Sequence, residues 1–234
     1  QRPGAAPAPA APREVREDIL AVLRARLAPG GLVYVAYNCM PGWAAIEPMR
    51  RLMNVYGSVV PGSTVEKATN ALAYLNLLNK SDAAYFVDTP PARRMLDMLI
   101  GMNPAYVAHE YLNEAWDPIY FGQMADDMAR VGLSYAGSLP LWSNVPELVI
   151  PEELQQVFRS APDRVAFESH KDFVTNQRFR VDIFTGRKLP PPRPLRRDGL
   201  KGLRMLGVVP HDRLDRELRF PYFTMRLDHP VYEP

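Results

Sequence analysis

The sequence predicts a mixed α+β protein, and three patterns support this fold class. Residues 13–38 combine an amphipathic helix, a tight turn and an apolar strand. Residues 42–131 repeat apolar side chains at helical spacing, with proline and glycine between the repeats. Residues 178–184 alternate polar and apolar side chains as a half-buried strand does. We expect a partial sheet first, then a mainly helical middle domain and a small β-rich C-terminal unit.

The first helix and strand are expected to belong to a doubly wound sheet. Pro29, Gly30 and Gly31 end the helix, and residues 32–37 are almost wholly apolar, β-branched or aromatic. Such a run is typical of a strand that is covered on both faces within a parallel sheet. The side chains expected to pack the helix against this sheet recur at helical spacing: Val15, Ile19, Val22, Leu23 and Leu27.

Ligands of doubly wound sheets bind beyond the carboxyl ends of the strands. Tyr37, Asn38 and Trp43 follow the predicted strand and are therefore the candidate catalytic residues. An equally good interpretation is that the two aromatic side chains pack the junction between the sheet and the helical domain. Cys39 has no base nearby in the sequence, so packing is favoured over a role as nucleophile.

Helical periodicity and turn signals predict the remaining elements. Ser63 or Thr64 is expected to cap a helix with Glu66, and Asp117 with Pro118 is expected to open another. The predicted helices span 42–56, 65–78, 92–100, 117–131, 151–160 and 162–176, and the predicted strands span 133–139, 178–184, 203–209, 214–220 and 222–227.

A polar group around His109 is the second candidate site. His109 and Glu110 match the start of a His-Glu-x-x-His zinc motif, but Asn113 stands where the second histidine would be, so no metal is expected. We expect these residues to lie on neighbouring turns of one helix and to form a polar cluster with Asp117 or Trp116, most simply in a structural role. The residues predicted to bind substrate are His109, Glu110, Tyr111, Asn113 and Trp116.

Two basic segments have simple structural explanations. Lys171 and the residues near Arg178 place cations by a helix C-terminus, where the helix dipole favours them. Residues 186–198 hold four prolines and are predicted to be a linker, and the arginines of 193–204 are more simply solvated than bound to an acidic partner.

Composition limits the function classes. The 234 residues are 47% hydrophobic with a net charge of +2, which gives no basis for nucleic-acid or membrane binding through charge. One cysteine excludes an internal disulfide, and no apolar run is long enough to span a bilayer. The N-terminus shows no apolar signal core, so a cytoplasmic location is expected.

Four segments together resemble a known family. Leu27-x-Pro29-Gly30-Gly31 leading into an apolar strand is similar to the late helix and fifth strand of class I S-adenosylmethionine-dependent methyltransferases. Residues 37–43, 106–121 with 132–138, and 171–184 resemble prokaryotic methyltransferases that carry a methyltransferase regulatory domain, a group that includes bacterial protein-lysine methyltransferases. The resemblance runs from about Val15 to the end of the chain.

The resemblance implies S-adenosylmethionine as the cofactor of the complete enzyme. The family's Gly-rich turn and the acidic residue that binds the ribose are both missing from this sequence. Residues 1–12 are a Pro/Ala-rich tract, expected to be a disordered tail. The chain is therefore expected to be the C-terminal portion of a methyltransferase whose cofactor half is lost, truncated or on another chain, and to bind no cofactor alone.

These interpretations divide the chain and leave two functions open. The leading hypothesis is a regulatory and substrate-recognition portion that acts on protein lysine, with a protein substrate, the missing methyltransferase half or a second copy as partner. The rival is a noncatalytic interaction module that has lost its cofactor site.

The expected units are a tail (1–12), the last helix and strand of a Rossmann-like domain (13–60), the helical regulatory domain (61–145), a helical and strand extension (146–187), and a linker with a small β-rich unit (188–234).

Overall fold

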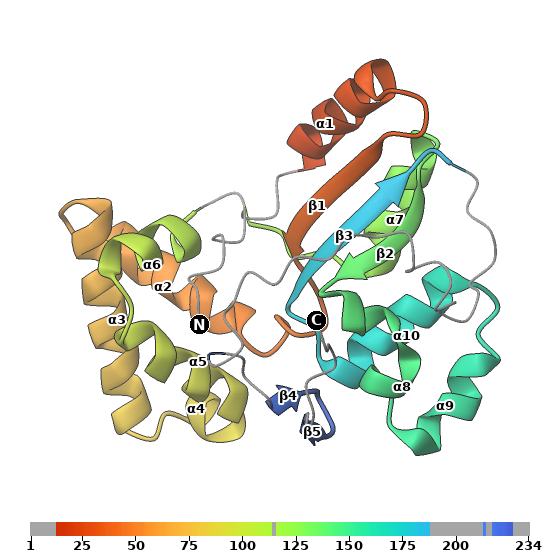
Figure 1. Ribbon diagram of the computed structural model, residues 1–234. Helices are drawn as coiled ribbons and strands as arrows, with labels where there is room; N and C mark the ends of the chain where they lie inside the picture. The colour runs from red at the N-terminus through yellow and green to blue at the C-terminus, as the bar shows by residue number, and fades with distance from the viewer. Residues whose placement is uncertain (1–12, 114–115, 188–212, 214–216, 227–234) are drawn as a thin grey trace.

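A computed structural model describes residues 13–113, 116–187, 213 and 217–226 (Figure 1). A three-stranded sheet stands at its centre, a group of helices lies to one side, and three further helices lie below the other end of the sheet. The predicted α+β fold class is confirmed.

The central sheet has the order β1-β3-β2. Its strands are β1 (Leu32–Asn38), β2 (Ser134–Leu139) and β3 (Phe179–Thr185). Both outer strands run antiparallel to β3, which makes them parallel to each other. All three strands were predicted from their side-chain patterns, and their existence is confirmed.

The predicted environment of the first strand was wrong. β1 pairs with an antiparallel neighbour, and Leu32 and Tyr34 are 68% and 60% exposed. Among the described residues the strand is therefore covered on one face only. An apolar run indicates a tendency to be buried, but it carries no information on the direction of the neighbouring strand.

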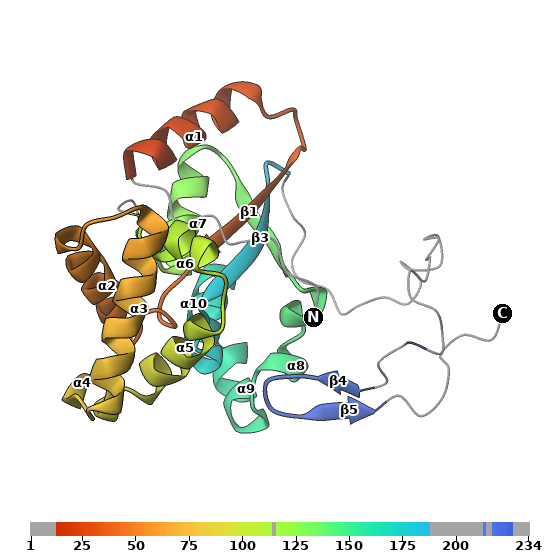
Figure 2. The same ribbon diagram turned by 90° about the vertical axis from the view of Figure 1, so that its left-hand side faces the viewer.

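One face of the sheet is covered by α1 (Arg13–Arg26), α7 (Phe121–Arg130) and α10 (Arg164–Thr175) (Figure 2). Phe184 of β3 is fully buried in the core between this face and the helices. That core also contains Leu20, Val33, Tyr37, Phe121, Met124, Met128 and Tyr135.

The packing face of α1 differs from the predicted one. Leu20 is buried and Leu23 and Leu27 pack against the same core, whereas Val15, Ile19 and Val22 are about half exposed. The helix carries two apolar stripes, and periodicity alone does not show which one meets the sheet.

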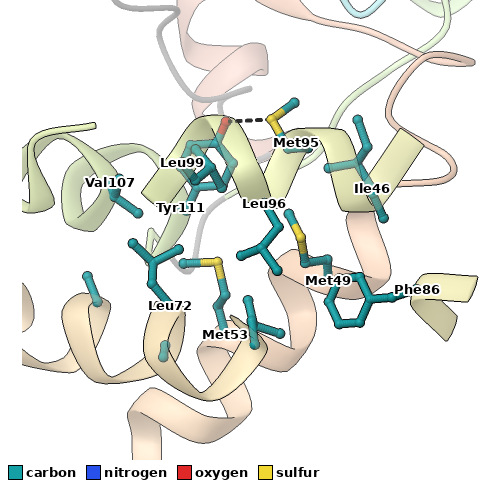
Figure 3. Packing of buried hydrophobic residues seen from close by; sticks show 14 of the residues in the cluster. Ile46, Met49, Met53, Leu72, Phe86, Met95, Leu96, Leu99, Val107 and Tyr111 are labelled. Carbon is teal, nitrogen blue, oxygen red and sulfur yellow. Dashed lines mark hydrogen bonds between the residues drawn. The ribbon is translucent and has the colours of Figure 1, made fainter. Parts of the chain in front are cut away.

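A separate helical group follows β1. It consists of α2 (Glu47–Val59), α3 (Thr64–Lys80), α4 (Ala84–Asp88), α5 (Pro90–Ile100) and α6 (Pro104–Tyr111). Apolar side chains from all five helices meet in one core (Figure 3). The predicted capping box of α3 is confirmed, because Ser63 Oγ accepts from the Glu66 amide and the Glu66 carboxylate accepts from the Ser63 amide.

Two predicted helix starts were wrong. α2 begins five residues later than predicted, because residues 40–46 form turns. α7 begins at Phe121, and Asp117 does not cap it: Gln123 Oε1 accepts from the Tyr120 amide instead. Ile119 lies in an extended segment that bridges to Cys39, and this pairing takes the segment out of the helix.

The remaining elements are η1 (Leu141–Asn144), α8 (Pro146–Val149), α9 (Glu152–Arg159), β4 (Glu217–Arg219) and β5 (Thr224–Arg226). Pairing of β4 with β5 confirms a hairpin within the predicted strands 214–220 and 222–227. The predicted tail (1–12), the strand 203–209 and most of the linker 186–198 lie outside the described residues. No helix in the described part of the chain has the length and apolarity needed to cross a membrane.

Candidate functional site

The carboxyl end of β1 is held against the connection between α10 and β3. Tyr37, 3% exposed, donates from its hydroxyl to Asp182 Oδ2 at 2.7 Å. Trp43 Nε1 donates to the Arg178 carbonyl oxygen at 2.9 Å. Both contacts match the packing interpretation of these aromatic side chains, and their catalytic role stays a prediction.

Asn38 and Cys39 share this buried setting. Asn38 is 3% exposed, and the Cys39 thiol is fully buried and donates to the Gln177 carbonyl oxygen. Burial raises the pKa of the Cys39 thiol, so it stays protonated near neutral pH. A buried neutral thiol is a poor nucleophile, which agrees with the packing role expected for it.

The turn between β1 and α2 offers no room for a nucleotide. A Cβ built on Gly42 would lie 2.6 Å from the carbonyl oxygens of Asn176 and Gln177, so the connection before β3 fills this space. This turn therefore lacks the open backbone cradle that a Gly-rich turn at the end of a strand offers to a nucleotide.

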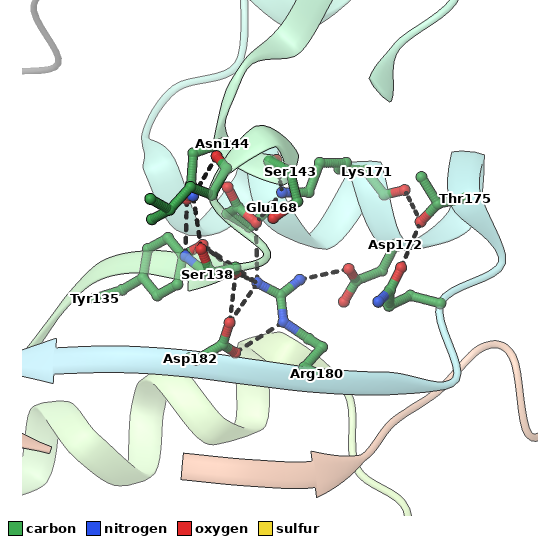
Figure 4. A network of polar contacts seen from close by, with 12 residues as sticks. Tyr135, Ser138, Ser143, Asn144, Glu168, Lys171, Asp172, Thr175, Arg180 and Asp182 are labelled. Carbon is green, nitrogen blue, oxygen red and sulfur yellow. Dashed lines mark hydrogen bonds and ion pairs between the residues drawn. The ribbon is translucent and has the colours of Figure 1, made fainter. Parts of the chain in front are cut away.

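A buried polar network joins β3 to α10 (Figure 4). Arg180, 3% exposed, contacts three carboxylates that are themselves almost fully buried: Asp182 at 2.8 Å, Glu168 at 2.9 Å and Asp172 at 2.5 Å. Lys171 Nζ lies 2.6 Å from Glu168. Two cations therefore face three carboxylates in a region that excludes water.

Strand β2 closes the network from the other side. Ser138 Oγ donates to Asp182 Oδ1 at 2.5 Å and accepts from Arg180 at 2.9 Å. Asn144 of η1 accepts from the Ser138 amide and donates to its carbonyl oxygen. The guanidinium of Arg180 also lies 4.2 Å from the ring centre of Phe121, so cation–π attraction adds to the ion pairs.

The carboxylates share the positive charge unequally. Burial raises the pKa of Asp172 to about 7, because Arg180 is divided among three acids and Asp172 Oδ2 has no hydrogen-bond partner in the described part of the chain. Burial also acts on Glu168, but Lys171 and Arg180 together hold the pKa of that carboxyl below its ordinary value.

The sequence pattern concealed this network. Alternation along 178–184 suggested polar side chains facing solvent, yet Arg180 and Asp182 are buried while Val181 and Ile183 are partly exposed. Lys171 was explained by the helix dipole, but it is 5% exposed and paired within the network. One signal for this network was available in the sequence. Acidic and basic side chains lie three and four residues apart on one helix, so they share a face, and the strand opposite also carries a base and an acid.

The second candidate site is an aromatic group with a buried acid. Trp43 meets Trp116 edge-on with ring centres 4.6 Å apart, and it lies 6.0 Å from Tyr111. The guanidinium of Arg50 stacks on Trp116 at 4.3 Å. Sequence reasoning placed Trp43 and Trp116 in two different sites, and the structure brings them together.

Glu110 is a buried acid that directly precedes Tyr111 on α6. It is 5% exposed, its Oε1 has no hydrogen-bond partner in the described residues, and burial raises its pKa. His109 Nε2 lies 3.8 Å from Glu110, and the histidine side chain is 71% exposed. Glu110 Oε1 is thus a buried carboxylate oxygen that makes no hydrogen bond in the described residues and faces His109 Nε2 at 3.8 Å.

The predicted helical arrangement of this site holds only in part. α6 ends at Tyr111, so Asn113 lies beyond the helix, where its carbonyl oxygen accepts from Arg50. Asp117 pairs with Arg16 and not with His109 or Glu110. In the described ranges no three histidine, cysteine or acidic side chains gather as metal ligands would.

Comparison with known proteins points to one family. Residues 103–186 match a family model described as a predicted methyltransferase regulatory domain. This segment of the chain is therefore similar to that domain. The matched segment contains α6, α7, β2, the helices α8 to α10 and β3, and therefore both the Arg180 network and Glu110.

The relatives that match this chain are longer proteins. An uncharacterized protein of Synechocystis sp. is 32% identical over 94% of this chain and 43% of its own length. An uncharacterized protein of Rickettsia prowazekii is 25% identical over 85% of this chain and 36% of its own length. The chain thus spans less than half the length of these relatives.

Solved structures agree with this fold. PKMT2 from Rickettsia typhi matches with a TM-score of 0.63 at 25% identity, covering 89% of this chain and 41% of PKMT2. The same protein in complex with AdoHcy matches with a TM-score of 0.65 at 23% identity, over 93% of this chain and 43% of PKMT2. The resemblance to methyltransferases with a regulatory domain is confirmed.

Proposed function

We propose that this chain is the regulatory and substrate-recognition portion of an S-adenosylmethionine-dependent methyltransferase that acts on protein lysine. The observation that carries the proposal is the regulatory-domain match over residues 103–186. The similarity to PKMT2, one of whose structures contains AdoHcy, supports the reaction class. The cofactor would be held outside this chain, because the family's Gly-rich turn and ribose-binding acid are missing from this sequence.

The group formed by Trp43, Tyr111, Trp116 and Glu110 is the proposed recognition site for the lysine. Aromatic faces attract an ammonium group, and a carboxylate neutralises its charge. Arg50 already lies on one face of Trp116, which suggests that this ring accepts a cation. Glu110 is a buried acid whose Oε1 makes no hydrogen bond in the described residues and lies 3.8 Å from His109 Nε2, and its burial strengthens any contact with an ammonium.

Tyr37 and Asn38 have a supporting role in this proposal. Methyl transfer to an amine is an in-line displacement, so the protein must mainly align the sulfonium carbon with the nitrogen. Tyr37 is anchored to Asp182, and Trp43 to the Arg178 carbonyl. These bonds fix the strand end beside the helical group and would hold the recognition site in position.

The experiment is methyl transfer from labelled S-adenosylmethionine to lysine-containing protein substrates by the longer protein that includes this chain. Glu110→Gln removes the charge at nearly constant volume, and we expect KM for the protein substrate to rise about tenfold with kcat little changed. Glu152→Gln, at an exposed acid on α9, is the control and should leave KM unaltered. A wild-type KM in the Glu110→Gln variant would reject the recognition site, and absence of any methyl transfer would reject the function.

A noncatalytic interaction module of the same family is the second candidate. The missing Gly-rich turn and the filled turn at Gly42 favour it. It predicts that this chain binds a partner methyltransferase and changes its rate, while no protein that contains the chain methylates anything by itself.

A further inference from the structure

Arg50 of α2 is a buried cation that forms no ion pair in the described part of the chain. It is 6% exposed, and its Nε makes no hydrogen bond there. Its Nη2 donates to the carbonyl oxygen of Asn113, which is a neutral acceptor. Burial lowers the pKa of Arg50 to about 10, and the attraction of Glu47, one turn earlier on α2, does not offset this effect.

Arg180, the other buried arginine described above, shows what Arg50 lacks. Arg180 pairs with three carboxylates, whereas Arg50 pairs with none in the described ranges. Buried charges in proteins are normally paired, because an uncompensated charge away from water is costly. The Nε and a neighbouring Nη of one guanidinium are the donors that a carboxylate takes in a bidentate pair. The unused Nε of Arg50 therefore indicates a carboxylate that the described residues do not supply.

Arg50 lies at the aromatic group proposed to recognise the lysine. Its guanidinium is 4.3 Å from the ring centre of Trp116, which meets Trp43 edge-on. Trp43 donates to the carbonyl oxygen of Arg178, and Arg178 is exposed. Burial raises the pKa of Tyr111, and the positive charge of Arg178 opposes this rise, so that charge reaches the aromatic group. Two arginines thus act on the proposed recognition site.

A lysine ammonium alone is a poor electrostatic match for this site. It would add a third positive charge to those of Arg50 and Arg178, and like charges close together repel each other. Glu110 offers only one negative charge in return. A substrate segment in which an acidic side chain stands next to the lysine adds no net charge, so its charges complement both the acid and the arginines.

We propose that Arg50 binds the carboxylate of an acidic residue next to the target lysine, so that the site selects lysines with an acidic neighbour. The carboxylate accepts from Nε of Arg50, and this charged acceptor is stronger than the neutral carbonyl oxygen of Asn113. Arg178, at the exposed side, attracts the acidic segment through space. This inference rests on the proposed function, since that function places the lysine at this aromatic group.

Matched peptides test the preference. The two peptides differ only in the residue after their single lysine, which is glutamate in one and glutamine in the other. With the longer protein that includes this chain, KM should be about tenfold lower for the Lys-Glu peptide than for the Lys-Gln peptide. Arg50→Gln should bring the two KM values to within about twofold, and Arg50→Lys, which keeps the charge, should retain part of the difference.

The ratio of the two KM values separates recognition from packing. A purely structural role of Arg50 would change both KM values equally and leave their ratio as it is. Arg94→Gln, at an exposed arginine of α5, is the control and should keep the wild-type ratio. A wild-type ratio near one overturns the proposal. A preference for Lys-Glu that survives Arg50→Gln also overturns it, because another residue then binds the acid.

A second variant keeps the test decisive if Arg50→Gln does not fold. Arg178→Gln changes an exposed side chain and should reduce the ratio about threefold through the loss of long-range attraction. Circular dichroism shows whether each variant is folded. An unchanged ratio in Arg178→Gln, together with an unfolded Arg50→Gln, overturns the proposal.

Peptide binding to this 234-residue chain separates the carboxylate site from the reaction. Quenching of tryptophan fluorescence follows binding without cofactor, because Trp43 and Trp116 lie at the site. Stronger quenching by the Lys-Glu peptide, without methyl transfer by the longer protein, keeps the carboxylate site and rejects the function. Methyl transfer with equal KM for both peptides keeps the function and rejects the carboxylate site. Equal quenching without methyl transfer rejects both.

Discussion

Arg180 is the centre of the buried polar network that joins α10 to β3. Its guanidinium faces Asp182, Glu168 and Asp172, all nearly inaccessible to water. A buried ion group contributes little against an apolar replacement of the whole group, but loss of one partner leaves uncompensated charge. The network therefore fixes one arrangement of α10 on β3.

Replacement of the arginine should be severely destabilising. We expect Arg180→Met to lower the free energy of unfolding by about 3–5 kcal/mol, because the carboxylates lose their shared cation. Urea unfolding followed by circular dichroism measures this loss. Arg219→Met, at an exposed arginine of β4, should leave the unfolding midpoint almost unchanged. Equal effects of the two substitutions would refute the importance of the network.

Asp172 should make stability depend on pH. Its pKa is about 7 in the folded protein and near 3.8 in the unfolded chain, so the folded state binds the proton more tightly. Between about pH 4 and 7 the unfolded chain releases this proton first, and stability from this group falls as pH rises. Above pH 7 the loss is complete.

The variant Asp172→Asn isolates this dependence. The free energy of unfolding of the wild-type chain, relative to that of Asp172→Asn, should decrease steadily from pH 4 to pH 7 and then level off. Denaturant titrations at several pH values provide the comparison. A difference that stays constant across this range, or grows with pH, contradicts the raised pKa of Asp172.

Single residues were the hardest features to predict. Polar side chains in the strand 178–184 suggested a solvent-facing row, and the charge spacing on the preceding helix does not by itself identify Arg180 and Asp182 as its buried partners. The decisive partners, Glu168 and Asp172, come from α10, and only the fold brings them there. Long-range charge pairing is invisible to local patterns.

At the scale of elements, the turn between β1 and α2 determines how the helical group meets the sheet. A methyl group at Gly42 would collide with two carbonyl oxygens before β3. Gly57 lies inside α2, and a methyl group there would meet only Lys67 and Leu112 at ordinary contact distances.

These two glycines form a matched pair for alanine substitution. Gly42→Ala should destabilise the protein by about 1–3 kcal/mol through overpacking. Gly57→Ala should stabilise it by about 0.5–1 kcal/mol, because alanine favours the helix. Thermal and denaturant unfolding measure both. A neutral Gly42→Ala would show that the junction is looser than this contact implies.

Elements were predicted well where their signals are local. The capping box at Ser63 and the apolar periodicity of α3 and α5 lie within a few residues of each other in sequence. Predictions failed where a segment distant in sequence determines the local structure. Pairing of Ile119 with Cys39 displaces the start of α7, and contact with the sheet determines which apolar stripe of α1 is buried.

For the whole molecule, the strand order explains the misjudged environment of β1. Its apolar composition is typical of a strand covered on both faces, and in the described residues one face and most of one edge are open. The antiparallel pairing of β1 with β3 is what the sequence reasoning missed, because the composition of one strand does not reveal the direction of its neighbour.

Calorimetric titration with S-adenosylmethionine tests the central claim most directly. It is carried out on this chain, on the separately expressed cofactor-binding portion, and on the two combined. We predict no heat of binding for the chain alone, and saturable one-to-one binding for the combined sample that supports methyl transfer. Saturable binding by this chain alone, or a combined sample that neither binds the cofactor nor transfers a methyl group, would contradict the account.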